Sequence, residues 1–270
     1  GVSGIAIDPN NSNTIFIATG DDDAGDSYAV GVWKSTDGGA TWNNTGTLTG
    51  NPNSMNEIYF FPGDSNKLMV ATSSGIYKSI DAGATWIRTS TVNTKSLKMK
   101  PNDATTWYAV SSNTFYKSTD SGASFQEISI PSLSGALRLE IDITPANANY
   151  VYIVKAGSGY SFDGIYKSTD SGSSFTKTAE ADDIFESTQA WYDLAFGVSD
   201  TDENTLFVGV LNVWKSTDAG DNFTKINNWN LPTQASYTHA DIHFLRYFDG
   251  TLFAGTDGGI YRSLDDGTNF

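Results

Sequence analysis

The sequence lacks cysteine altogether and has few basic residues. Without cysteine the chain can form neither a disulfide framework nor a thiolate metal site. The chain has 16 lysines and arginines and 31 aspartates and glutamates, which gives a net charge of −15. Such a charge repels phosphate backbones and anionic lipids, so we expect no nucleic-acid partner and no membrane insertion. No apolar run approaches the ~20 residues that span a bilayer, and residues 1–15 lack a basic start followed by an apolar core, so we expect neither a membrane protein nor an intact secretory precursor.

One motif occurs six times. It first appears as GVWKSTDGGATW at residues 31–42, and every copy carries a serine, an aspartate, a glycine and a closing aromatic residue at the same offsets. Successive motif aspartates are 44, 39, 50, 48 and 47 residues apart. A period of this length fits one four-stranded β-propeller blade per repeat, with loops absorbing the variation. The motif aspartates are Asp37, Asp81, Asp120, Asp170, Asp218 and Asp265.

The repeats predict an all-β fold built from four-stranded blades. In each repeat, short segments rich in β-branched and aromatic residues are bounded by Pro, Asn, Asp or Gly, as in SGIAIDP at 3–9 and TIFIAT at 14–19. The sixth repeat has no segment for an outer strand, and an open blade leaves unpaired backbone groups at its edge. We therefore expect one partial β-propeller that belongs to a larger one of seven or more blades or is completed by another segment. The expected blades cover approximately residues 1–50, 51–93, 94–132, 133–180, 181–230 and 231–270.

The repeated motif is better explained as a turn than as an active site. Between two strands, Ser35 and Asp37 can bond nearby backbone amides, and Gly39 supplies a positive φ. The closing aromatic, Trp42 in this copy, then packs between sheets. A catalytic centre is normally built once, whereas this motif occurs in every blade. The basic residue that recurs before the motif serine, Lys34 in the first copy, is expected to be a structural partner of neighbouring acids.

The motif resembles the Asp-box, also called the bacterial neuraminidase repeat. All six copies carry its Ser, Asp, Gly and aromatic residue, although Asn222 and Asn269 replace the usual Ser or Thr. The resemblance covers the whole chain and implies a β-propeller, but sialidases, xyloglucanases and sortilin-type receptors share it, so it implies no single function. Stretches such as GDDDAGDSYAVGVWKSTDGG also resemble segments of large secreted Bacteroidota proteins with sortilin-like propellers. That likeness implies a bacterial protein that is extracellular or at the cell surface and is exported by the type nine secretion system.

Four carboxylates occupy equivalent positions on the expected inner strands. Strand order places the long, uneven loops on the propeller face opposite the motif turns, and such loops usually carry function. Alternation puts Glu57, Glu140, Asp193 and Asp241 on one side of their strands. These acids either form a partial ring at the mouth of the central channel or bond backbone amides of adjacent blades. The sequence leaves both alternatives open.

Two further groups of residues are candidate metal ligands. His239, Asp241 and His243 alternate along one expected strand, so period two places them on one face, with Asp257 of a nearby turn as a further oxygen ligand. A hydrogen-bonded cluster lining the channel is the alternative reading. Calcium is the candidate cofactor at Asp21, Asp23 and Asp26, which crowd one loop, and a solvated loop with Asx turns is the alternative there.

The residues favour recognition over catalysis. Sialidases of the resembling family use three arginines to bind the substrate carboxylate and carry an Arg-Ile-Pro signature. This chain has four arginines, one of them in the repeated motif, and none precedes Ile-Pro, so we do not expect a sialidase. A glycoside hydrolase of the xyloglucanase type remains the alternative, with Asp193 and Asp241 as the catalytic pair. We expect a non-catalytic module of a larger secreted or surface protein, with a glycan or protein ligand and the rest of its own longer chain as partners. Its candidate binding residues are Glu57, Glu140, Asp193, His239, Asp241, His243, Asp257, Trp229 and Tyr237, and the loop aromatics Tyr160, Phe162, Trp191 and Tyr192 are further stacking candidates, with loop packing the better reading for the last two.

Overall fold

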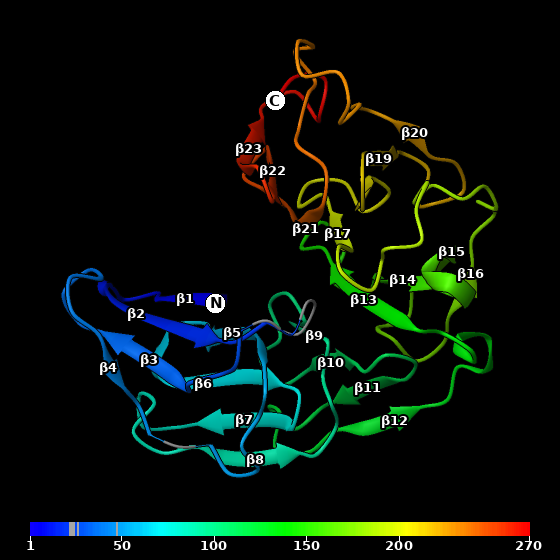
Figure 1. Ribbon diagram of the computed structural model, residues 1–270. Coiled ribbons are helices and arrows are strands. Elements are labelled where there is room, and N and C mark those ends of the chain that lie inside the picture. Colours follow the sequence, from blue (N-terminus) through cyan, green and yellow to red (C-terminus); the bar gives the residue numbers. More distant parts are fainter. Residues whose placement is uncertain (22–24, 26, 47) are drawn as a thin grey trace. The chain divides into compact units, whose positions relative to one another are not determined.

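The computed structural model describes residues 1–21, 25, 27–46 and 48–270. These residues form six antiparallel sheets, each a propeller blade, which confirms the predicted all-β class and the four-stranded blades (Figure 1). The sheet that comes last in the sequence has three strands among the described residues. The chain divides into two compact units, Gly1–Glu127 with blades 1 to 3 and Ile128–Phe270 with blades 4 to 6.

The first unit contains three blades whose strands pair in sequence order. Blade 1 consists of β1 (Val2–Asp8), β2 (Asn11–Thr19), β3 (Val32–Ser35) and β4 (Asn43–Asn44). Blade 2 consists of β5 (Met55–Phe61), β6 (Asp64–Thr72), β7 (Gly75–Ser79) and β8 (Ile87–Ser90). Blade 3 consists of β9 (Ser96–Met99), β10 (Trp107–Val110), β11 (Phe115–Ser118) and β12 (Gln126–Ile128).

The second unit repeats this plan. Blade 4 consists of β13 (Arg138–Ile143), β14 (Val151–Ala156), β15 (Phe162–Ser168) and β16 (Thr176–Lys177). Blade 5 consists of β17 (Ala195–Val198), β18 (Leu206–Gly209), β19 (Val213–Ser216) and β20 (Thr224–Lys225), and blade 6 of β21 (Ile242–Phe248), β22 (Thr251–Thr256) and β23 (Gly259–Ser263). The described helices are the three-residue 3₁₀ turns η1 (Pro131–Leu133) and η2 (Ser158–Tyr160), and none in this part of the chain is long and apolar enough to cross a membrane.

The hydrophobic core lies between neighbouring sheets. Alternating residues of blade 1, such as Phe16 and Ala18, pack against Ile58 and Val70 of blade 2 in one buried cluster. Equivalent clusters join blade 2 to blade 3, blade 4 to blade 5 and blade 5 to blade 6. Each blade therefore buries both faces of its sheet only when it has a neighbour on each side.

The repeated motif is a turn closed by its own side chains, as predicted. In the first copy the Ser35 Oγ accepts the Gly39 N–H at 2.8 Å, and Asp37 Oδ1 accepts the Thr41 N–H at 2.9 Å. Asp37 Oδ2 also accepts the Thr41 hydroxyl at 2.6 Å, and these hydrogen bonds lower the pKa of Asp37 to about 2. The residue after the aspartate, Gly38, has a φ of 73° and donates its N–H to the carbonyl of Asn13 near the start of β2.

In blades 1, 2 and 5, the basic residue before the motif serine links its blade to the motif turn of the next. Lys34 lies over the Phe16 ring and donates to the Ala82 carbonyl at 3.1 Å, and Lys78 donates to the Ser121 carbonyl at 2.7 Å. Lys215 pairs with Asp266 at 3.4 Å. The predicted acidic partner is present for Lys215, whereas the other two lysines bond backbone carbonyls. In all three cases the acceptor belongs to the residue directly after the motif aspartate.

Replacing a motif serine is expected to weaken its turn. The Ser118 side chain is buried, and its Oγ accepts the buried N–H of Gly122 at 2.9 Å and the N–H of Asp120 at 3.4 Å. Ser118→Ala leaves the Gly122 N–H without its acceptor, so the free energy of unfolding should fall by about 1–3 kcal/mol in urea denaturation. Thr119→Ala, at the exposed neighbouring position, is the control. Equal stability of both variants and the wild type would show that the motif serine has no structural role.

Candidate functional site

Three loops of the second unit meet at one end of the inner strands of blades 5 and 6. The loop before β17 supplies Gln189 and Asp193, the loop before β21 supplies Asp241, and the turn between β22 and β23 supplies Asp257. Asp241 has a φ of 59°, in the left-handed region that aspartate tolerates better than most residues. Its carbonyl accepts the Asp257 N–H at 3.3 Å, and this bond joins the second loop to the third.

Gln189 bridges two carboxylates. Its Nε2 donates to Asp193 Oδ2 at 3.1 Å and to Asp241 Oδ1 at 2.6 Å. Asp193 has an exposed fraction of 0%, and its Oδ1 is a buried oxygen without a hydrogen-bond partner in the described part of the chain. Burial raises the pKa of Asp193 to about 7, opposed by the Gln189 hydrogen bond and assisted by the charge of Asp241. Asp193 is therefore largely protonated below neutral pH, and a protonated carboxyl is compatible with its enclosed position.

Next to this bridge, Asp257 joins an imidazole to a phenol. Its Oδ1 lies 3.0 Å from His243 Nε2, and its Oδ2 accepts the Tyr192 hydroxyl at 3.0 Å. The Tyr192 and His243 rings meet edge to face with centroids 4.7 Å apart. Trp191 lies against Tyr192 at 5.6 Å between ring centroids, and 49% of its surface is exposed. This arrangement presents an indole, a phenol, an imidazole and a carboxylate together. We call Trp191, Tyr192, Asp241, His243 and Asp257 the blade 5–6 surface.

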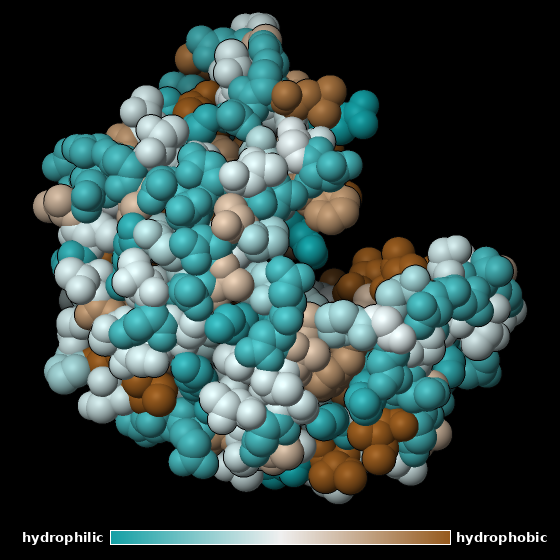
Figure 2. All heavy atoms as spheres, turned by 180° about the vertical axis from the view of Figure 1, so that it is seen from behind, coloured by the Kyte–Doolittle hydropathy of each residue, from teal (hydrophilic) through white to brown (hydrophobic). Residues whose placement is uncertain are grey.

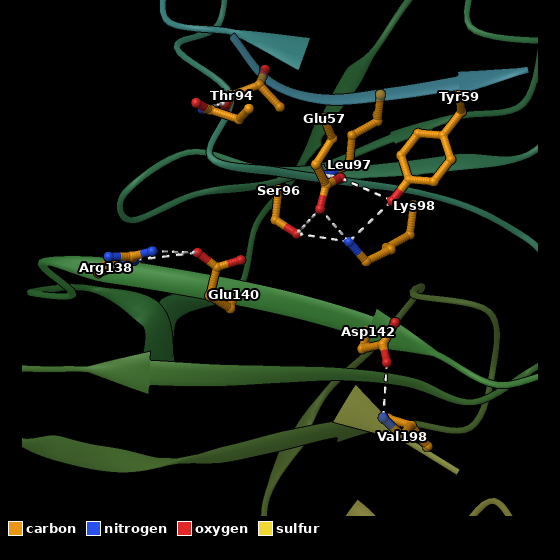
Figure 3. A network of polar contacts seen from close by, with 11 residues as sticks. Glu57, Tyr59, Thr94, Ser96, Leu97, Lys98, Arg138, Glu140, Asp142 and Val198 are labelled. Atoms are coloured by element: carbon orange, nitrogen blue, oxygen red, sulfur yellow. Dashed lines mark hydrogen bonds and ion pairs between the residues drawn. The ribbon is translucent and has the colours of Figure 1, made fainter. Parts of the chain in front are cut away.

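Glu140 acts behind this surface through Arg138. The Arg138 guanidinium pairs with Glu140 Oε1 at 3.2 Å, as Figure 3 shows. Its Nη1 donates to the backbone carbonyls of Ala190 at 3.3 Å and Trp191 at 3.1 Å. Glu140, which the sequence suggested as a binding residue, therefore positions the loop that carries Trp191.

Glu57, in the first unit, bonds a neighbouring blade. Its Oε2 accepts the Leu97 N–H at 2.7 Å, and its Oε1 forms an ion pair with Lys98 (Figure 3). Asp142 of blade 4 does the same in the second unit, where its Oδ2 accepts the Val198 N–H of blade 5 at 2.8 Å (Figure 3). Of the two roles expected for these acids, a channel-mouth ring or a bond to the backbone of an adjacent blade, Glu57 has the second. The expected acidic ring would combine Glu57 of the first unit with carboxylates of the second unit. This ring stays a prediction.

The alternation expected for His239, Asp241 and His243 is wrong. Strand β21 begins only at Ile242, and the positive φ of Asp241 breaks the extended backbone before it. His239 therefore lies outside the strand, with its Nδ1 3.0 Å from the Ala240 carbonyl and its side chain against Gly258. His243 contacts Asp257 directly, whereas the sequence suggested Asp257 as a further ligand of a metal.

The remaining candidates lie elsewhere or outside the described residues. Trp229 is exposed and donates its backbone N–H to Asn212 Oδ1 at 3.0 Å, and Tyr237 stacks edge to face on Tyr261. Of the calcium candidates, Asp21 donates its backbone N–H to the Ser27 carbonyl, while Asp23 and Asp26 lie outside the described residues. Among the residues that the structure describes, no group of three or more His, Cys, Asp or Glu could hold a metal ion.

Gln189 is the site residue that sequence reasoning missed. It lies in the irregular segment AEADDIFESTQAW, and only the length of that loop pointed to it. A glutamine has no charge and no repeated spacing here, so no pattern in one sequence marks it as the link between Asp193 and Asp241.

Comparison with known proteins identifies the family. The Sortilin-Vps10 model, described as sortilin, neurotensin receptor 3, matches residues 74–208, which is half of the chain. The chain belongs to the Sortilin-Vps10 family. No curated protein sequence matches it.

Solved structures related to this Sortilin-Vps10 chain are propellers of other kinds. An ancestral GH74 enzyme is 19% identical with a TM-score of 0.72, over 97% of this chain and 36% of the enzyme. The GH74 enzyme of Niastella koreensis is 22% identical with a TM-score of 0.68, over 98% of this chain and 45% of the enzyme. Ycf48 bound to D1 peptide is 14% identical with a TM-score of 0.64, over 97% of this chain and 78% of Ycf48. The chain thus spans less than half the length of the GH74 enzymes, and at these identities the likeness concerns the fold.

Proposed function

We propose that the chain is a non-catalytic recognition module that binds a glycan or protein ligand at the blade 5–6 surface. The observation that carries the proposal is the half-exposed Trp191, whose ring lies against Tyr192. Tyr192 in turn donates to Asp257, which also contacts His243. An aromatic face of this kind stacks on a sugar ring or an apolar side chain, and the neighbouring carboxylates orient hydroxyl or cationic groups of the ligand.

Hydrogen bonds from neighbouring residues fix the conformation of the blade 5–6 surface. Arg138 bonds the Trp191 carbonyl, and Asp257 accepts the Tyr192 hydroxyl, so the loop before β17 is fixed at both residues. A preorganised site loses less conformational entropy when a ligand binds. The Sortilin-Vps10 family model is described by the receptor name neurotensin receptor 3, and Ycf48 was solved with a peptide, which places peptides among the ligand classes to test.

Arrays of glycans and of peptides test this function. We expect wild-type protein to retain a ligand class that Trp191→Ala loses by at least tenfold in affinity, because the indole supplies the main apolar contact. Tyr28→Ala removes another exposed aromatic ring in the other unit and should bind as the wild type does. Binding that is insensitive to Trp191→Ala, or absent for every ligand, would contradict the assignment of this surface.

A glycoside hydrolase is the second candidate, favoured by one observation. Asp193, with a pKa of about 7, and Asp241 share the Gln189 Nε2, so their bonded oxygens are within about 6 Å of each other, near the spacing of retaining glycosidases. Against it, Asp193 is fully enclosed, and a general acid must reach the glycosidic oxygen. Release of reducing sugar from xyloglucan that Asp241→Asn abolishes would establish this alternative.

For its setting, we propose a bacterial protein that is extracellular or at the cell surface, within a larger secreted polypeptide exported by the type nine secretion system. The acidic charge and the resemblance to secreted Bacteroidota propellers support this location. Detection of the protein in the medium or on intact cells, and its loss in a strain that lacks that secretion system, is the expected result. Retention in the cytoplasm of the wild-type strain would contradict it.

A further inference from the structure

The blade 5–6 surface has carboxylate oxygens that can accept further hydrogen bonds. Asp257 Oδ1 lies 3.0 Å from His243 Nε2, Asp257 Oδ2 accepts the Tyr192 hydroxyl, and 42% of the Asp257 side chain is exposed. Asp241 Oδ1 accepts from Gln189, whereas its Oδ2 has no hydrogen-bond partner in the described part of the chain. Of the residues that make up this surface, only His243 can carry a positive charge. The surface therefore offers acceptors to a ligand that brings donors.

The arginine behind this surface is already neutralised. The Arg138 guanidinium pairs with Glu140 at 3.2 Å, and 12% of the Arg138 side chain is exposed. Residues 179–193, the segment before β17, contain five acidic and no basic residues. An anionic ligand would be repelled here, and a cationic one attracted.

The exposed indole is a second feature that suits a cation. Elsewhere in this chain lysines lie over aromatic rings: Lys167 Nζ is 4.5 Å from the Tyr150 centroid, and Lys225 Nζ is 5.5 Å from the Trp214 ring. Trp191 is 49% exposed, and no cation of the described residues lies over its ring. Tryptophan gives the strongest cation–π attraction of the aromatic side chains. Its exposed ring is thus available to the cation of a ligand.

A buried carboxyl adds to the negative potential at Asp241. Asp193 has an exposed fraction of 0%, and its Oδ1 has no hydrogen-bond partner among the described residues. Its Oδ2 shares the Gln189 Nε2 with Asp241 Oδ1, so the two carboxyls lie close together. Electrostatic interactions are stronger in such an enclosed site than in water. A cation bound at Asp241 would therefore interact favourably with both groups.

We propose that the blade 5–6 surface binds a basic segment of a partner protein through a lysine or arginine side chain. The side chain lies along Trp191 and Tyr192, and its charged group bonds the carboxylates of Asp241 and Asp257. Figure 2 shows that hydrophilic residues predominate on the face it presents, and the net charge of −15 attracts a basic partner over a longer range. The loops that form the surface lead into the inner strands of blades 5 and 6, so it is not a sheet face that a further blade would cover. This inference rests on the recognition function proposed above and names its ligand class.

Fluorescence polarisation with two labelled peptide pairs tests the charge requirement. The first pair is an acetylated and amidated glycine-serine peptide with a central Lys-Ser-Lys segment, and the same peptide with norleucine in place of lysine. The second pair has arginine and its uncharged analogue citrulline at these positions. We expect the charged member of at least one pair to bind at least tenfold more tightly than its neutral counterpart. The pair that shows this difference distinguishes an ammonium from a guanidinium.

Charge-matched variants test whether this binding belongs to the blade 5–6 surface. Asp241→Asn keeps an oxygen for the Gln189 bond and tolerates the positive φ, so the fold is retained, and affinity for the charged peptide should fall about tenfold. Asp257→Asn should have a similar effect. Asp182→Asn removes the same charge from an exposed position of the same unit and should bind as the wild type does.

Two results would overturn the basic ligand. One is equal binding of charged and neutral peptides, and the other is an equal loss of affinity in Asp241→Asn and Asp182→Asn, which would show attraction by net charge alone. A neutral glycan that binds the wild type and not Trp191→Ala, while no basic peptide binds, would also overturn it and leave the recognition function in place. Protein that binds neither glycans nor peptides would contradict both.

Discussion

Raising the pH from about 4 to about 8 is expected to destabilise the second unit through Asp193. The native pKa of about 7 lies above the usual value of 3.8, because the carboxyl is buried. Between these two values the native state holds a proton that the unfolded state has lost, so the contribution is complete below about pH 4 and is lost as the pH rises through 7. A shift of this size corresponds to roughly 4 kcal/mol of unfolding free energy.

Asp193→Asn should remove this part of the pH dependence. Its amide oxygen can still accept from Gln189, and it carries no charge at any pH, so thermal unfolding midpoints of the variant should vary less between pH 4.5 and pH 8 than those of the wild type. The motif aspartates act in a different range, because their lowered pKa values cost stability only as the pH falls below about 4. Asp182→Asn, an exposed carboxylate of the same unit, is the control. Identical pH profiles for the wild type and Asp193→Asn would contradict the buried, protonated state of Asp193.

Trp107→Ala is expected to be the most destabilising single truncation in the first unit. Trp107 is fully buried between blades 2 and 3, with its ring 5.0 Å from Phe61 and 6.2 Å from Tyr59 between centroids. Removing the indole leaves a cavity and loses its Nε1 hydrogen bond to the Ala104 carbonyl, so the free energy of unfolding should fall by about 3–5 kcal/mol.

Urea denaturation followed by circular dichroism measures this loss. Trp229→Ala removes the same side chain from an exposed position in the other unit, and its cost should be much smaller. If the two truncations cost the same, the packing between blades 2 and 3 would not be the main support of the first unit.

The repeat made the fold predictable, because each of its six copies has the same turn-forming residues at the same offsets. The Ser35, Asp37 and Gly39 pattern specifies its turn through bonds that span at most four residues, so the sequence alone contains all partners. The bonding partner of the lysine before the motif serine was harder to predict. For Lys34 it is the backbone carbonyl of Ala82 in the next blade, and a backbone carbonyl carries no sequence signal.

The candidate site was only partly predictable for the same reason. Asp193 and Asp241 could be placed at equivalent positions of their repeats, although they lie in the loops before β17 and β21 and not on strands. The bridge between them is Gln189, in a loop that no periodicity governs. The break at Asp241 also could not be read from the pattern, since ADIHFLR at 240–246 alternates as a strand does. Its positive φ turns His239 away from His243, and only tertiary contacts of the loop determine that conformation.

The central claim, recognition without turnover at the blade 5–6 surface, is tested most directly by following a bound ligand. A ligand identified on the arrays is incubated with the protein, its affinity for the wild type and for Trp191→Ala is measured by calorimetry, and its mass is then determined. The proposal predicts at least tenfold weaker binding by Trp191→Ala and a ligand recovered with unchanged mass. A shortened ligand whose formation is abolished by Asp241→Asn would contradict it.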